Sequence, residues 1–233
     1  MIDQPPALAG MLIVEDPLGR QQLNGTAFAL WRDDLAVTAH HCLKPLPVGW
    51  GRRVAWHGQS SRRALRSVAH PDADLAVLHL EPGPAAAAPF ELGKCPARHS
   101  ECAIFGYAWD IVPPAAAEPG SQIRRGDLLK TSATGTAFGA APSCGTDSIG
   151  AVLQLDAPPG FSGGPAFATA QPQYALGVTS CSGQSRTPRF LDLDGPPIPP
   201  EQETFVVTLA DYAGWLAAAA QTSSFEPSDK VSG

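Results

Sequence analysis

The sequence is poor in charge, and it has no excess of basic residues. Charged side chains make up 16% of its 233 residues, and the formal net charge is −6. A net negative charge gives no long-range attraction to nucleic-acid phosphates or to anionic lipid. The two short basic pairs, Arg62–Arg63 and Arg124–Arg125, are typical of solvated surface. We therefore expect neither a nucleic acid nor a membrane as partner.

Long hydrophobic runs are also absent. No apolar run reaches the roughly 20 residues that a membrane-spanning helix needs. The first residues include Asp3, whereas a secretory signal would carry basic residues there. We expect a cytoplasmic location.

Cysteine is scarce, and its spacing is uninformative. The five residues form an odd set, so they cannot all pair, and none shows the CxxC spacing of a zinc site. We expect no metal, no cofactor and no need for a disulfide scaffold. The residues are Cys42, Cys95, Cys102, Cys144 and Cys181.

The chain is rich instead in short apolar runs separated by Gly, Pro and Asp. Hydrophobic residues make up 44% of the sequence, which is enough for a packed core. The runs do not alternate with helical segments, so they predict an antiparallel all-β fold. The runs are Met11–Val14, Thr26–Trp31, Leu35–Ala39, Leu75–Leu80, Ala103–Tyr107, Leu128–Thr131, Ala151–Leu155, Tyr174–Thr179 and Thr204–Leu209.

Two stretches interrupt this pattern. Glu81–Pro89 is mostly Pro, Gly and Ala and is typical of a link between two β modules, while Val112–Gly120 predicts a long surface loop. After Asp211, the residues Tyr212, Trp215 and Leu216 follow helical spacing and predict a helix that packs on the second module.

The polar segment that follows the predicted helix has no pattern and predicts a tail or linker, as in a domain of a longer protein. The sequence therefore predicts three parts, which are an N-terminal module at 1–90, a C-terminal module with its helix at 91–220, and a flexible segment at 221–233.

The most informative segment is Pro159–Pro165, which reads Pro-Gly-Phe-Ser-Gly-Gly-Pro. Glycines beside Ser162 allow a tight exposed turn in which the N–H groups of Ser162 and Gly160 point at one spot, as in an oxyanion hole. A serine hydroxyl is a weak nucleophile, so it needs a base and a group that orients the base. Ser162 is our candidate nucleophile.

The candidate base follows an expected strand. Residues 37–42 read Val-Thr-Ala-His-His-Cys, which resembles the Thr-Ala-x-His-Cys motif of chymotrypsin-like serine proteases. The resemblance, aligned on Cys42, implies His41 as the general base, with His40 as the competing histidine. It also implies two six-stranded antiparallel Greek-key β-barrels and a C-terminal helix.

The family's acid lies in an Asp-hydrophobic-Ala-hydrophobic-Leu strand, which matches Asp74–Leu78. Asp72 is the competitor, because it would share a strand face with Asp74. The order His, Asp, Ser is also the family's order. The resemblance implies that Asp74 accepts a hydrogen bond from His41 and that Ser180 supports Asp74 from behind.

The resemblance implies a serine endopeptidase that takes protein or peptide substrates through an acyl-enzyme. Residues 177–182 resemble the strand that borders the primary specificity pocket, with Ser182 at the pocket entrance. Asp156 lies six residues before Ser162, where trypsin-type members bind Lys or Arg. Two P1 preferences stay open, one for basic side chains and one for small or aliphatic side chains.

The sequence departs from digestive members of the family in two ways. Phe161 stands where those members have an aspartate that pairs with a processed N-terminus. Asn24 and Ala168 stand where partners for Cys42 and Cys102 would be. Both departures resemble intracellular bacterial relatives, including Deg-type proteases. A regulated protease in stress response or phage defence, with an activator or fused sensor and effector domains, is the expected context. A catalytically silent fold acting as a binding or regulatory module is the alternative.

Overall fold

The computed structural model describes residues 7–56, 61–83, 87–108, 121–135, 148–182 and 203–221, with the backbone alone described at 129–135 and 181–182. The predicted loop at Val112–Gly120 lies outside these ranges, and so does the flexible segment predicted at 221–233 except for Gln221.

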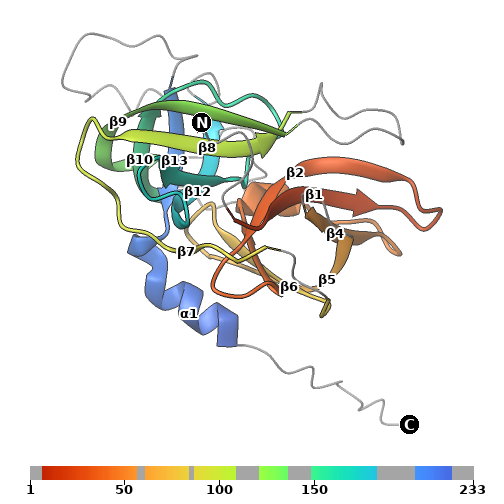
Figure 1. Cartoon of the computed structure of the whole chain (residues 1–233). Helices are drawn as coiled ribbons and strands as arrows, with labels where there is room; N and C mark the ends of the chain where they lie inside the picture. Colours follow the sequence, from red (N-terminus) through yellow and green to blue (C-terminus); the bar gives the residue numbers. More distant parts are fainter. Residues whose placement is uncertain are drawn as a thin grey trace.

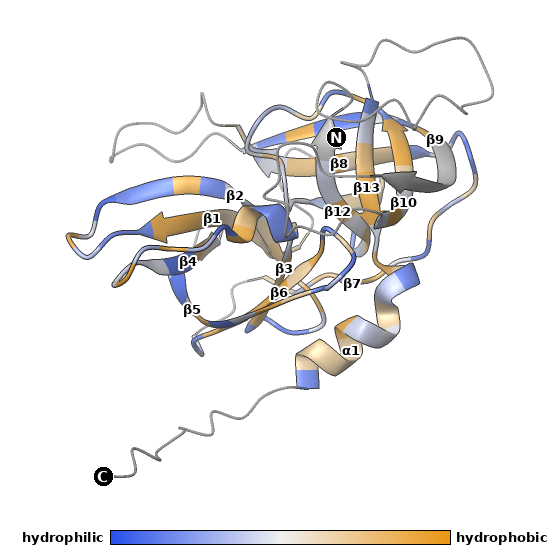
Figure 2. Cartoon of the chain, turned by 180° about the vertical axis from the view of Figure 1, so that it is seen from behind, coloured by the Kyte–Doolittle hydropathy of each residue, from blue (hydrophilic) through white to orange (hydrophobic). Residues whose placement is uncertain are grey.

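The first half of the chain closes into a barrel of six antiparallel strands in the order β1-β2-β3-β6-β5-β4 (Figure 1). β3 and β6 are buried along almost their whole length, as their continuous apolar runs predict. β5 has many hydrophilic residues (Figure 2), and all its residues except Arg62 are exposed or half-buried. The strands are β1 (Ala9–Glu15), β2 (Gln21–Ala29), β3 (Leu35–Thr38), β4 (Gly51–Trp56), β5 (Ser61–Ala69) and β6 (Ala76–Leu80).

The second half forms another ring of six antiparallel strands, β8-β9-β10-β13-β12-β11, which closes through the pairing of β11 with β8. The short strand β7 (Glu91–Leu92) adds to β12 in parallel. The six strands are β8 (Glu101–Tyr107), β9 (Ser121–Gly135), β10 (Ser148–Gln154), β11 (Pro165–Ala168), β12 (Tyr174–Ser182) and β13 (Glu203–Thr208).

Aromatic side chains join the two barrels. Phe90, in the connection between them, packs edge-on against Phe28 of β2, with 5.5 Å between ring centroids. On its other side it packs against Phe167 of β11, at 6.2 Å. All three rings are fully buried, and they belong to one apolar cluster that includes residues of both barrels. The two halves therefore share a core.

The chain ends in the 3-10 turn η6 (Ala210–Tyr212) and the helix α1 (Ala213–Gln221), which lies against the first barrel (Figure 1). The ring Nε2–H of His79 on β6 donates to the carbonyl of Ala219 at 3.0 Å. The rings of Tyr212 and Trp215 pack edge-on against His70 of the first barrel. The hydroxyl of Tyr212 also accepts the backbone N–H of Ile149 on β10 at 2.7 Å, so the expected contact with the second module is present. The contacts with the first barrel were not expected.

The helix α1 has nine residues, and no helix in the described part of the chain is long and apolar enough to cross a membrane.

Candidate active site

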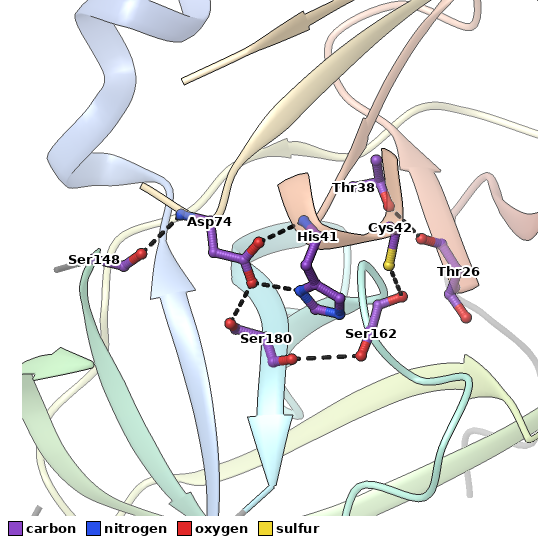
Figure 3. Close-up of polar contacts among 8 residues, drawn as sticks. All are labelled: Thr26, Thr38, His41, Cys42, Asp74, Ser148, Ser162 and Ser180. Carbon is purple, nitrogen blue, oxygen red and sulfur yellow. Dashed lines mark hydrogen bonds and ion pairs between the residues drawn. The ribbon is translucent and has the colours of Figure 1, made fainter. Parts of the chain in front are cut away.

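Four segments meet where the two barrels face each other. The first barrel supplies the 3-10 turn η1 (His40–Leu43), which follows β3, and the loop before β6 that carries Asp74. The second barrel supplies the loop before β11 that carries Ser162, together with Ser180 on β12. Residues far apart in the sequence thus come together at the interface between the barrels (Figure 3).

His41 is bound to Asp74 by two hydrogen bonds. Its backbone N–H donates to Asp74 Oδ1 at 2.8 Å, and its ring Nδ1 lies 2.7 Å from Asp74 Oδ2. A carboxylate only accepts hydrogen bonds, so Nδ1 must carry the proton. The ring lies between Asp74 and Ser162 (Figure 3). In the neutral ring, Nε2 is then left free to accept a proton.

The pKa values of the pair move in opposite directions. Burial alone would lower the pKa of His41, but the charge and hydrogen bond of Asp74 hold it well above 6.5. Burial alone would raise the pKa of Asp74, but His41 and the hydroxyl of Ser180 hold it below 3.8. The carboxylate is therefore ionised at neutral pH although it has no exposed surface.

Two serines from the second barrel support Asp74. The hydroxyl of Ser180 donates to Asp74 Oδ2 at 2.5 Å. The backbone N–H of Asp74 donates to the hydroxyl oxygen of Ser148 at 2.8 Å, and both serines are buried. Both the side chain and the backbone of Asp74 are thereby held across the interface.

Ser162 lies half-buried on a tight turn between glycines. Gly160 and Gly163 have φ of +99° and +87°, which favour glycine. A β-carbon on Gly163 would also collide with the carbonyl oxygen of Thr26. The Ser162 hydroxyl donates to the carbonyl of Ser180 at 3.4 Å, a long bond. Within the described part of the chain, the N–H groups of Gly160 and Ser162 bind no other group.

Asp72 and His40, the alternatives to Asp74 and His41, do not take part in the hydrogen bonds between His41 and Asp74. Asp72 is exposed, and its backbone N–H donates to the ring Nδ1 of His70 at 3.1 Å. His40 lies on the same 3-10 turn as His41, yet both hydrogen bonds from this turn to Asp74 come from His41.

Two predicted specificity residues, Asp156 and Ser182, lie near the ends of β10 and β12. Asp156 is exposed, two residues after the end of β10. A strong preference for a basic P1 side chain would require a dry site, whereas an exposed carboxylate is hydrated. Ser182 ends β12, and its side chain lies outside what the structure describes.

Cys42 and Cys102 have neighbours other than cysteine at the positions where the family resemblance implies disulfide partners. The side-chain amide of Asn24 donates to the carbonyl of Cys42. Ala168 stands opposite Cys102 in the pairing of β11 with β8. In the described residues, no three His, Cys, Asp or Glu side chains lie close enough to hold a metal ion.

Sequence reasoning did not find the roles of Thr26 and Ser148. The hydroxyl of Thr26 donates to the carbonyl of Gly160 at 2.8 Å and accepts the N–H of Tyr107 at 3.2 Å. Neither Thr26 nor Ser148 stands in a motif that indicates a polar role. Only the folded structure shows their hydrogen-bond partners.

Comparison with known proteins identifies the family. The model of the trypsin-like peptidase domain matches residues 25–178, so the chain belongs to this family. The predicted fold of two six-stranded barrels with a C-terminal helix is confirmed. A comparison with curated proteins gives no match.

Several solved structures share this fold. The active form of the Rv3671c protease from M. tuberculosis has a TM-score of 0.66 and 18% identity, over 94% of this chain and 83% of that chain. The HtrA-type protease AlgW, solved with a decapeptide, has a TM-score of 0.62 and 17% identity, over 94% and 65%. Kallikrein-related peptidase 10, solved with Zn²⁺, has a TM-score of 0.58 and 18% identity, over 94% and 98%. At these identities the likeness concerns the fold.

Proposed function

We propose that this protein is a serine endopeptidase with Ser162 as nucleophile, His41 as general base and Asp74 as the residue that orients the base. The observation that carries the proposal is the hydrogen bond between the His41 ring and the fully buried Asp74, with the ring facing Ser162. The Nδ1 proton is held by Asp74, so neutral Nε2 is the nitrogen that takes the proton of the hydroxyl.

The reaction follows from these roles. Ser162 Oγ attacks the substrate carbonyl carbon while His41 Nε2 takes its proton, and the N–H groups of Gly160 and Ser162 donate to the oxygen that becomes negative. His41 then gives the proton to the leaving amine as the C–N bond breaks. Water hydrolyses the acyl-enzyme with His41 again as base. For the attack, the Ser162 hydroxyl must turn from the Ser180 carbonyl to His41.

A peptide is the substrate that fits this site best. The pairing of β11 with β12 ends at Val178. The backbone of Ser180, further along β12, is therefore not paired with β11. An extended peptide can pair with this part of β12 by strand addition. The HtrA-type relative solved with a decapeptide is in keeping with such a substrate.

The proposal is tested with a fluorophosphonate probe, which labels an activated serine, and with a peptide library. We expect labelling and cleavage by the wild type, and loss of both in Ser162→Ala and His41→Ala. His40→Ala is the matched control and should keep both. If the wild type is neither labelled nor cleaves any peptide, the enzymatic proposal fails and a binding or regulatory module takes its place.

The same library decides the P1 preference. Cleavage after Lys or Arg that is lost in Asp156→Ala would support a pocket for basic P1 side chains. Cleavage after small or aliphatic residues that is unchanged in Asp156→Ala would support a preference for small or aliphatic P1 side chains.

A further inference from the structure

The loop that carries Ser162 is held from two sides by residues outside the proposed triad. We propose that Thr26 and Phe161 are positioning residues that keep the Gly160–Ser162 turn in its assembled conformation before substrate arrives. The inference rests on the proposed function, because it concerns the N–H donors for the oxyanion. It goes further by naming what aligns them.

Thr26 binds this turn at two points. Its hydroxyl donates to the carbonyl of Gly160 at 2.8 Å, and its backbone N–H donates to the carbonyl of Ser162 at 2.8 Å. The hydroxyl oxygen accepts the N–H of Tyr107, so its own hydrogen is left for Gly160. Thr26 is fully buried, so none of these bonds competes with water. One residue of the first barrel thus fixes the carbonyls on both sides of Phe161.

Phe161 holds the same turn from inside the second barrel. Its ring has no exposed surface and belongs to the apolar cluster of that barrel. Gly106 on β8 provides the space, because a β-carbon there would lie 2.5 Å from Cγ of the ring. Turning the loop outward would bring this ring into water, which the hydrophobic effect opposes.

The N–H of Ser162 is aligned by a further hydrogen bond within the loop. It belongs to the peptide unit whose carbonyl, that of Phe161, accepts the N–H of Gly164 at 2.9 Å. In a trans peptide the N–H points opposite to the carbonyl, so this bond sets the direction of the Ser162 donor. The N–H of Gly163 donates to the carbonyl of Thr179 at 2.8 Å and ties the turn to β12.

These contacts come from β2, β8, β12 and the loop itself. Among the described residues, none of these contacts involves a terminal amino group. A folded tag fused before Met1 should therefore leave kcat/KM within about twofold of the untagged chain, on the same peptide substrate.

The test compares Thr26→Val with Thr26→Ser. Valine keeps the shape but removes the hydrogen bonds to the Gly160 carbonyl and from the Tyr107 N–H, whereas serine keeps the hydroxyl. Thr204→Val is the matched control, because Thr204 is another buried threonine whose hydroxyl donates to a backbone carbonyl, that of Leu155 at 2.9 Å. Two quantities are measured, which are the steady-state kinetics and the hydrogen exchange of residues 159–165.

We expect Thr26→Val to lower kcat by roughly tenfold or more with little change in KM, and to speed the exchange of this loop by about tenfold. Thr26→Ser and Thr204→Val should change neither. Phe161→Leu, which leaves part of the ring's space empty, should shift both quantities in the same direction as Thr26→Val. It provides a second route if Thr26→Val does not fold.

Unchanged exchange in both Thr26→Val and Phe161→Leu would overturn the inference, whatever the kinetics. If exchange rises as expected but the wild type shows neither labelling nor cleavage, the positioning role stands as a property of the loop and the proposed function fails. The two proposals therefore fail separately.

Discussion

Asp74→Asn changes the charge of the central pair while keeping its size. The carboxylate accepts two hydrogen bonds at Oδ2, from His41 at 2.7 Å and from Ser180 at 2.5 Å. An amide has one accepting oxygen, and its nitrogen only donates. With the amide oxygen facing the His41 backbone N–H, its nitrogen faces the ring and favours the tautomer with the proton on Nε2. That nitrogen then cannot take the proton of Ser162, and we expect kcat to fall by about 10⁴-fold.

The same substitution should move the pH dependence of kcat/KM. In the wild type, Asp74 overcomes the effect of burial and holds the pKa of His41 well above 6.5. Only neutral His41 is a base, so activity should rise with pH, with its midpoint above 6.5. In Asp74→Asn the charge is gone and burial remains, so the pKa of His41 and the midpoint should both move to lower pH.

The assay is the hydrolysis of a fluorogenic peptide across the histidine titration range, with Asp72→Asn as control. Asp72 is exposed and lies outside the pair, so its variant should keep both the rate and the midpoint of the wild type. A midpoint that does not move in Asp74→Asn, or a kcat within tenfold of the wild type, would refute the reasoning.

Three further substitutions follow from the same contacts. Ser148→Ala leaves the buried N–H of Asp74 without an acceptor, so urea unfolding should show a loss of about 1–3 kcal/mol and kcat should fall, whereas Ser148→Thr should preserve both. Phe90→Ala removes a fully buried ring that packs on Phe28, and thermal and urea unfolding should show a loss of about 3–5 kcal/mol. His41→Ala leaves Asp74 buried and unpaired, at a cost of about 3–5 kcal/mol in urea unfolding. In the wild type, the pKa of His41 is raised in the folded state, so the stabilisation by the ion pair of His41 and Asp74 is fully present below pH 6.5. It should be lost as the pH rises through the folded-state pKa of His41.

The sequence was informative where chemistry or burial restricts residue choice. Ser162 between glycines, His41 before Cys42 and Asp74 before an apolar strand each stand in a local pattern. The strands with continuous apolar runs were equally clear, and β3 and β6 are buried as predicted.

Other features have no local pattern. β4 and β5 carry many arginines and few β-branched residues, so no strand was expected there, and pairing with neighbours makes them strands. The contacts of the helix α1 with the first barrel were not predicted, because an apolar stripe indicates that a helix face is covered but not which element covers it. The hydroxyl of Thr26 has its partners 81 and 134 residues away in sequence.

The geometry of the site and the docking of the barrels depend on the same interface. The bond from Asp74 to Ser148 crosses this interface, and so does the bond from Thr26 to Gly160. Phe90 fills the apolar part of it between Phe28 and Phe167. A small shift of one barrel against the other would break the polar bonds first, because hydrogen bonds weaken steeply with geometry while apolar contacts depend mainly on buried area. Loosening of the interface should therefore lower kcat before it unfolds either barrel.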